Sequence, residues 1–212
     1  QVLEDLLANG IQPERVLIGT FLGNDIHDCA WAKSFPVKDG VLGDTEGVPS
    51  FFKHHSHLYR LIGSVYHRSR AGPASLRPEE GEMSNPERWS SGFLHDAFAV
   101  YRRELERIAQ LCRERSLPLT VLILPSARML MSLRGEALPS APDAETDYAL
   151  PLRQVAALLA ELDIQTLDPC AELALHPTES QYFRFDGHFT PEAHQAVCAA
   201  ILEQLPALVG KP

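Results

Sequence analysis

Two short runs of apolar residues constrain the fold of this chain most strongly. They are "RVLIGTFL", residues 15–22, and "LPLTVLILP", residues 117–125. Both are apolar at successive positions instead of alternating with polar residues, which is typical of strands buried on both faces in a parallel sheet between helices. "DIQTLD", residues 163–168, predicts a third and shorter strand.

Segments with helical periodicity separate these strands. The chain opens on part of a helix that stops at Asn9 and Gly10, a good C-terminal signal. Apolar residues then recur every three or four positions along 93–112 and 152–162, and Thr190 predicts the cap of a last helix. Strands that alternate with helices indicate an α/β fold with a parallel sheet.

A long insertion interrupts this alternation within what we read as a single domain, residues 1–212. Residues 30–92 are rich in Gly, Pro and Ser and predict a long loop, or lid, with one or two short helices. Its "HHSH", residues 54–57, has no carboxylate or Cys at matching ligand spacing, so a polar helix edge is favoured over a metal site. No cofactor is indicated.

Composition limits the classes of partner. Lys and Arg number 19 against 28 Asp and Glu, and the formal charge of -9 argues against a nucleic-acid-binding protein. No apolar run approaches the roughly 20 residues of a membrane-spanning helix. Residues 1–15 lack the pattern of a signal peptide, and the compartment, cytoplasmic, periplasmic or secreted, stays open.

The four cysteines are widely spaced and form no CxxC motif. This favours free, mostly buried thiols over a disulfide framework. Cys29 and Cys170 both follow predicted strands, so whether these two pair stays open.

Polar residues gather where the predicted strands end. Asn24 and Asp25 follow the first strand, and Ser126 follows the second. Asp168 ends the third, and the loop beyond it contains "FDGHFTPEAH", residues 185–194, with Asp186 and His188. Sites of parallel α/β sheets lie beyond the carboxyl ends of the strands, so these residues are expected to form one site.

An Asp and a His two residues apart can work together. A carboxylate that binds one ring nitrogen fixes the tautomer of a His acting as general base through the other. Asn24 offers a neutral NH2 group suited to stabilising an oxyanion. The alternatives are a turn-capping Asp186, a His188 on the surface or at a helix cap, and an Asn24 that only ends the strand. Asp25 is read as structural, stabilising the turn.

"VLIGTFLGNDIHD" and "FDGHFTPEAH" together resemble the third and last conserved blocks of SGNH (GDSL-type) hydrolases. The resemblance covers nearly the whole chain and implies a flavodoxin-like, three-layer α/β/α fold and ester chemistry through Ser, His and Asp. It implies His188 as base, Asp186 as its orienting partner, and an oxyanion hole containing Asn24 and Gly23. His27, close to Asn24, is a candidate substrate contact. Two sequence departures are Leu22 in place of a Gly and a spacing of Asp-x-His.

The family's Gly-Asp-Ser nucleophile block is missing from the sequence. We therefore expect a chain that lacks its first two strands, with "VLIGTFL" at an exposed sheet edge. Ser126 between Pro125 and Ala127 lacks the glycine-flanked turn of a nucleophile. The expected function is an esterase acting on ester substrates such as O-acetyl sugars, with the nucleophile outside this chain. The alternatives are a sugar O-acetyltransferase, a non-catalytic module that binds carbohydrate or protein, and a second polypeptide that supplies the missing strands.

Overall fold

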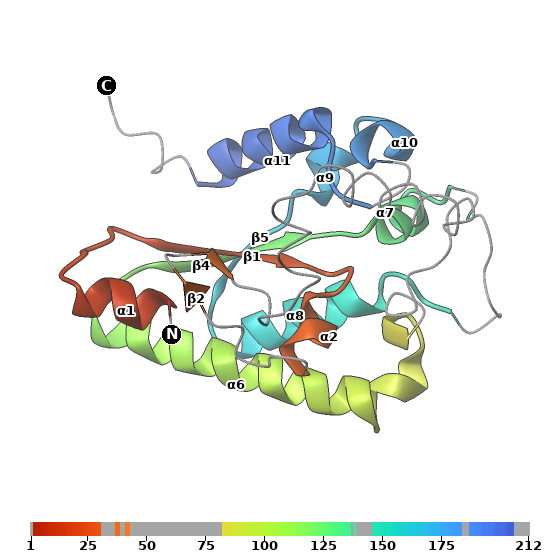
Figure 1. Cartoon of the computed structure of the whole chain (residues 1–212). Helices are drawn as coiled ribbons and strands as arrows, with labels where there is room; N and C mark the ends of the chain where they lie inside the picture. The colour runs from red at the N-terminus through yellow and green to blue at the C-terminus, as the bar shows by residue number, and fades with distance from the viewer. Residues whose placement is uncertain are drawn as a thin grey trace, which may run out of the picture.

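The computed structural model describes residues 2–30, 37–38, 41–42, 82–136, 138, 146–183 and 187–205. Figure 1 shows the arrangement of the elements. In chain order they are α1 (Val2–Ala8), β1 (Val16–Phe21), α2 (Asp25–Ala30), β2 (Val37–Lys38), β3 (Val41–Leu42), the 3-10 helix η1 (Pro86–Trp89), α6 (Phe93–Glu114), β4 (Leu119–Leu124), α7 (Ala127–Leu133), α8 (Leu150–Glu161), β5 (Gln165–Leu167), α9 (Cys170–Leu173), α10 (Thr178–Gln181) and α11 (Pro191–Gln204).

The central feature is a parallel sheet with the strand order β1-β4-β5. In the pairing of β1 with β4, Val16 lies opposite Leu119 and Phe21 lies opposite Leu124. All three strands expected from the sequence are present, each shorter than the segment that predicted it. The predicted α/β class and parallel sheet are therefore confirmed.

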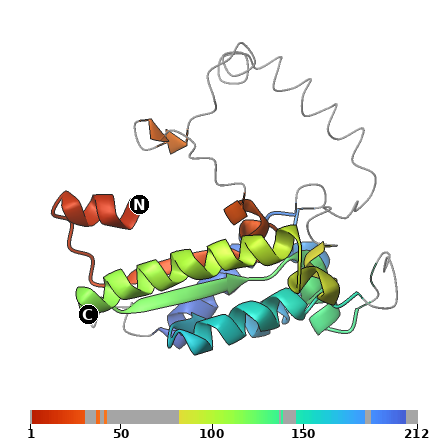
Figure 2. The same ribbon diagram turned by 90° about the horizontal axis from the view of Figure 1, so that it is seen from below.

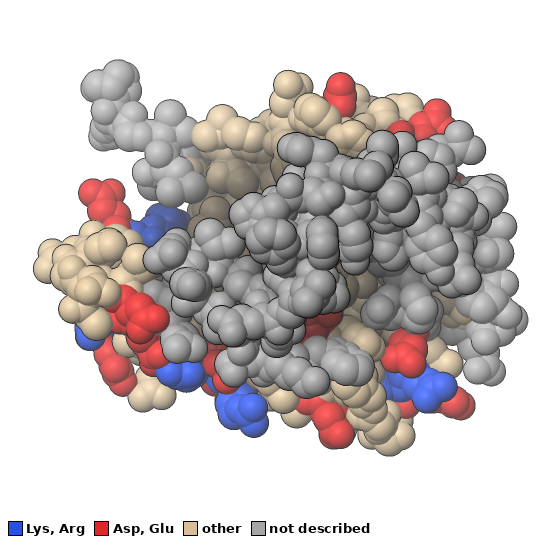
Figure 3. Space-filling model, viewed as in Figure 1, with Lys and Arg blue, Asp and Glu red and all other residues tan. Residues whose placement is uncertain are grey.

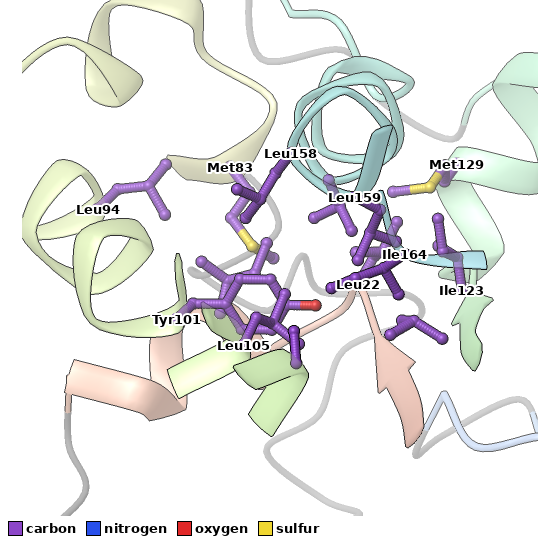
Figure 4. Packing of buried hydrophobic residues seen from close by; sticks show 14 residues of the cluster. Leu22, Met83, Leu94, Tyr101, Leu105, Ile123, Met129, Leu158, Leu159 and Ile164 are labelled. Atoms are coloured by element: carbon purple, nitrogen blue, oxygen red, sulfur yellow. The ribbon is translucent and has the colours of Figure 1, made fainter. Parts of the chain in front are cut away.

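Helices cover both faces of the sheet because the side chains of the central strand β4 alternate between two apolar clusters. Val121 and Ile123 pack into a cluster that includes residues of α6 and α8 (Figure 4). Leu122 packs into a second cluster dominated by α11. Figures 1 and 2 show the corresponding layers, with α6 and α8 on one side of the sheet and α11 on the other. This three-layer arrangement is compatible with a flavodoxin-like fold.

Strand β1 lies at one edge of the sheet formed by the described strands, as the sequence predicted. Its burial is uneven. Thr20 is buried and its hydroxyl lies 3.0 Å from the Tyr101 hydroxyl of α6, whereas Leu17 is 41% exposed. The face of β1 that lies toward α6 is therefore more buried than the face that lies toward α11.

Two helices that follow the strand ends were not expected from the sequence. Helix α2 begins at Asp25, directly after β1, where a turn alone was predicted. Helix α7 begins after Ser126, whose Oγ accepts a hydrogen bond from the Met129 amide, in a stretch for which no helix was predicted. The predicted cap of the last helix is present, since Thr190 Oγ1 accepts from the Ala193 amide.

Most of the predicted insertion at 30–92, including "HHSH", lies outside the described residues. Its described parts include an antiparallel pairing of β2 with β3, which the sequence did not predict. They also include the short helix η1, capped by Asn85. The buried side chain of Met83 joins the cluster on the α6 side of the sheet. The end of the insertion is thus part of the core.

Charged side chains of both signs are interspersed along the α6 side of the molecule (Figure 3). Arg102 of α6 pairs with Glu161 of α8 at 2.5 Å, and Arg107 of α6 pairs with Glu4 of α1. In the described part of the chain, no helix is both long and apolar enough to cross a bilayer.

Candidate functional site

The candidate site lies beyond the carboxyl ends of the sheet, where the polar residues singled out in the sequence were expected to meet. The three parallel strands end at Phe21, Leu124 and Leu167. Each is followed closely by a short helix: α2, α7 and α9. The segment that contains His188 returns to this edge between α10 and α11.

The loop after β1 is fixed by its own side chains. The Phe21 amide donates to Asp25 Oδ2 over 2.7 Å, and Asn24 Nδ2 donates to Asp28 Oδ2 over 2.5 Å. These bonds close the strand-to-helix turn in which Asn24 sits. One of the two amide hydrogens of Asn24 suffices for the bond to Asp28, so the side chain is oriented while retaining a second donor.

Burial and the neighbouring charge of Asp28 raise the pKa of Asp25, and the hydrogen bond from the Phe21 amide partly offsets that increase. The carboxylate of Asp25 bonds to the backbone at the start of its own turn. This is the geometry of a residue that stabilises a turn.

Gly23 is buried against the aromatic ring that ends β1. A Cβ at this position would lie 2.3 Å from Cε1 of Phe21. Such an approach is far inside van der Waals contact, so the ring of Phe21 occupies the space that any larger residue at position 23 would need. The backbone beside Asn24 can follow this path only because residue 23 has no side chain.

A narrow loop presents His188. The Phe183 amide donates to the His188 carbonyl over 2.8 Å, and Tyr182 forms an antiparallel bridge with Phe189. Gly187 has φ of 70°, a left-handed conformation that favours glycine. The side chain of His188 is exposed. Asp186, predicted to orient it, lies outside the described residues.

Aromatic rings join the His188 loop to the loop of Asn24. The ring of Phe189, next to His188, meets the ring of Phe21 edge-on, with centroids 6.4 Å apart. Tyr182 packs against the other side of this small cluster, 5.0 Å from Phe189 between centroids. Its hydroxyl donates to the Pro125 carbonyl, directly after β4, over 2.8 Å. The ends of β1 and β4 and the His188 loop therefore form one packed unit.

Thr190 secures the other end of the loop. Its amide donates to the Gln181 carbonyl, and its hydroxyl donates to the Ser180 carbonyl over 2.6 Å while accepting from Ala193. The cap of α11 and the base of the His188 loop are thus the same residue. Backbone bonds on both sides of the loop limit how far His188 can move.

His27, predicted as a substrate contact, touches the end of the insertion and the start of α6. Its Nε2 lies 3.6 Å from Glu82 Oε2, and its ring packs 4.5 Å from that of Phe93 between centroids. These contacts connect α2 to the end of the insertion and to the start of α6. The structure therefore groups His27 with that junction.

The polar residues after β4 and β5 bond to the backbone at the start of the helices that follow. Ser126 is 3% exposed and caps α7, so its hydroxyl is removed from solvent. Asp168 Oδ1 accepts from the Cys170 amide over 2.8 Å at the start of α9. Ser126 is therefore withdrawn from a substrate, whereas Asp168 is only partly buried.

All four cysteines are free thiols, so Cys29 and Cys170 do not pair. The prediction of mostly buried thiols holds for Cys112, whereas Cys29 and Cys170 are partly buried and Cys198 is exposed. Burial raises the pKa of Cys29 to about 11, helped by the charges of nearby carboxylates. Among the described residues, no group of three or more His, Cys, Asp and Glu side chains is placed to hold a metal ion.

Sequence reasoning missed the residues that hold the site together, namely Phe21, Tyr182 and Phe189. A signal was present, because aromatic residues stand on both sides of the Asp186 and His188 pair in "QYFRFDGHF". Aromatic residues that flank a tight polar loop can pack on each other across its base and close it.

Comparison of the chain with models of protein families, with curated proteins and with solved structures gave no match in any of the three.

Proposed function

We propose that this chain supplies the base and the oxyanion-binding half of an acyl-transfer site that cleaves esters, in the manner of SGNH hydrolases. The observation that supports this most is the packing of Phe21 on Phe189, which places the loop of Asn24 beside the loop of His188. An oxyanion donor and a general base must flank the same carbonyl group, and these two loops share one edge of the sheet.

In the proposed reaction, a serine hydroxyl attacks the ester carbonyl while His188 takes its proton. The carbonyl oxygen becomes an oxyanion and is bound by the free N–H of Asn24 and by backbone near Gly23. His188 then returns the proton to the departing alcohol as the C–O bond breaks, leaving an acyl-serine. Water attacks this intermediate and gives a proton to His188; the acyl–serine C–O bond then breaks to release the acid, and His188 returns the proton to the serine oxygen.

The residues of this chain have separate roles in that scheme. His188 is exposed and can reach a substrate, and Asp186 is proposed to hold its ring. Asn24 is oriented by Asp28. We assign no attack to Ser126, because it is a buried helix cap. A sugar hydroxyl in place of water would make the same site an O-acetyltransferase.

The experiment is a hydrolysis assay with a short-chain aryl acetate on the full product of the gene that encodes this chain. His188→Ala should lower kcat by a factor of at least about 1,000, because loss of the base removes nucleophile activation. His176→Ala is the control, since the described bonds of His176 involve only its backbone: its carbonyl accepts from Arg134 and its amide donates to the Leu173 carbonyl. Hydrolysis that survives in His188→Ala would refute the assignment of the base.

Addition of a sugar acceptor separates the two acyl-transfer reactions, since transfer consumes the ester without releasing an equivalent amount of free acetate. A full product that cleaves no ester yet binds an acetylated sugar would favour the non-catalytic binding module. Binding is measured by calorimetry on the same preparation.

A further inference from the structure

Tyr182, at the base of the His188 loop, contacts both the loop and the end of a strand. Tyr182 directly follows α10, and it is only 6% exposed. It forms the bridge with Phe189, packs on the Phe189 ring and bonds to Pro125 through its hydroxyl. Two of these contacts hold Phe189 in the loop, and the third reaches the end of β4.

The hydroxyl contact is the longest-range of these. The Tyr182 hydroxyl donates to the Pro125 carbonyl, 57 positions away in the chain, in a buried setting. Pro125 directly follows the central strand β4. A buried hydrogen bond is costly to leave unmade, because the Pro125 carbonyl would lose its partner without gaining water. The loop is therefore anchored to the end of the central strand of the sheet.

Two backbone links transmit this anchor to His188. Phe183, the residue after Tyr182, donates its amide to the His188 carbonyl, and its own carbonyl accepts from the Gly187 amide on the other side of His188. Any displacement of Tyr182 thus displaces the backbone on both sides of the imidazole. The Phe189 ring also touches Phe21, so the same displacement disturbs the loop of Asn24.

From this geometry we propose that Tyr182 is the positioning residue for His188, holding the imidazole at the working distance from the substrate through the Pro125 bond. The inference rests on the proposed function of His188 as a general base. Tyr182 itself contacts no reacting atom. Small errors in the placement of a catalytic group lower the rate strongly while leaving substrate binding nearly intact.

The variant Tyr182→Phe tests the anchor, because it removes one oxygen and keeps the ring that packs on Phe189. In the full gene product we expect kcat for aryl acetate to fall roughly tenfold or more, with KM unchanged. Tyr182→Leu, which also loses the ring contact, should lower kcat further.

The matched control is Tyr101→Phe. Tyr101 is another 6% exposed tyrosine whose hydroxyl makes a buried bond, to Thr20, but it lies in the cluster on the other side of the sheet. Both variants lose one buried hydroxyl bond, so their thermal stabilities should fall by similar amounts. Only Tyr182→Phe should lose kcat.

Hydrogen exchange of the Phe183 amide gives a measurement that needs no activity. This amide bonds to the His188 carbonyl, so its exchange should accelerate severalfold in Tyr182→Phe. In Tyr101→Phe, measured equally far below its own Tm, the exchange rate should stay unchanged. Unchanged exchange in Tyr182→Phe would overturn the anchor whatever the assay shows.

The results separate the two proposals. Loss of hydrolysis in His188→Ala, together with equal kcat values for Tyr182→Phe and Tyr101→Phe, would overturn the positioning role and leave the base assignment intact. Retained hydrolysis in His188→Ala would overturn the function, and the positioning role with it.

Discussion

The edge of the Phe21 ring meets the ring of Phe189 at an interplanar angle of 76° and a centroid distance of 6.4 Å. Phe21 ends β1, and its register with Leu124 places it on the same face as the α11 layer. Phe189 lies between His188 and the helix cap Thr190. This single contact joins the two loops that are proposed to act on one substrate.

A double-mutant cycle measures the energy of this contact. We expect Phe21→Leu and Phe189→Leu to be less destabilising together than the sum of the single effects, with a coupling free energy of about 1 kcal/mol. The measurement is the free energy of unfolding in urea. As a control, Phe21→Leu combined with Phe98→Leu should be additive, because Phe98 packs on Trp89 in the other cluster. Additivity of the Phe21 and Phe189 variants would contradict the contact.

A methyl group at position 23 should break the same contact. Gly23→Ala requires the Phe21 ring to move, since the new Cβ would lie 2.3 Å from it. We expect a loss of about 1–3 kcal/mol in unfolding free energy. Shortening residue 21 makes room, so Gly23→Ala should cost much less in a Phe21→Ala background.

Gly19→Ala is the matched control for that experiment. A Cβ at Gly19 would meet Leu124 Cδ1 at 3.8 Å, an ordinary contact, so the change should be nearly neutral. A Gly23→Ala cost that is the same with and without the Phe21 ring would show that the ring is not the obstacle.

The layer order of this fold could be predicted from the sequence because burial on both faces leaves a plain signal. Apart from one Thr in each, "VLIGTF" and "LTVLIL" contain no polar residue on either face, and both are strands. Thr190 followed by Pro191 predicted the start of α11 for an equally local reason, since the cap and the first turn lie within a few residues of each other.

Helices α2 and α7 were missed because they are only 6 and 7 residues long and begin inside sequences typical of turns. The Gly-Asn-Asp sequence after β1 is typical both of a turn and of a helix start. Only the bonds from Asn24 to Asp28 and from Phe21 to Asp25, seen in the structure, show that a helix begins here. The bond from Tyr182 to Pro125 depends on how α10 packs, which no local pattern encodes.

The amide of Asn24 is predicted to stabilise the oxyanion, so Asn24→Ala in the full gene product should lower kcat about 100-fold or more, with a small change in KM. Asp28→Ala should lower kcat by a smaller factor, because it frees the side-chain amide of Asn24 from its hydrogen bond but leaves that amide in place. Steady-state hydrolysis of an aryl acetate measures both.

Asn9→Ala is the control for the asparagine experiment. Asn9 also uses its side-chain NH2 to bond within a turn, to the Asp5 carbonyl, but it lies at the end of α1 and is exposed. Its loss should leave kcat unchanged. Equal kcat values for Asn24→Ala and Asn9→Ala would remove Asn24 from the oxyanion hole and leave it as a turn residue.

The cysteines should differ sharply in reactivity, because only a thiolate alkylates rapidly. At pH 7.5, iodoacetamide should modify the exposed Cys198 first, whereas burial keeps Cys29 protonated, with a pKa of about 11. Cys170 should be slower still, since burial and the Asp168 carboxylate raise its pKa strongly. The alkylation rate at Cys29 should rise about tenfold per pH unit up to its pKa, as mass spectrometry of labelled peptides would show.

Between about pH 9 and about pH 11 the folded state keeps the proton on Cys29, whereas the unfolded chain releases it. The free energy of unfolding should therefore fall as the pH rises through this range. Labelling of Cys29 as fast as that of Cys198 at pH 7.5 would show that α2 opens readily from α6.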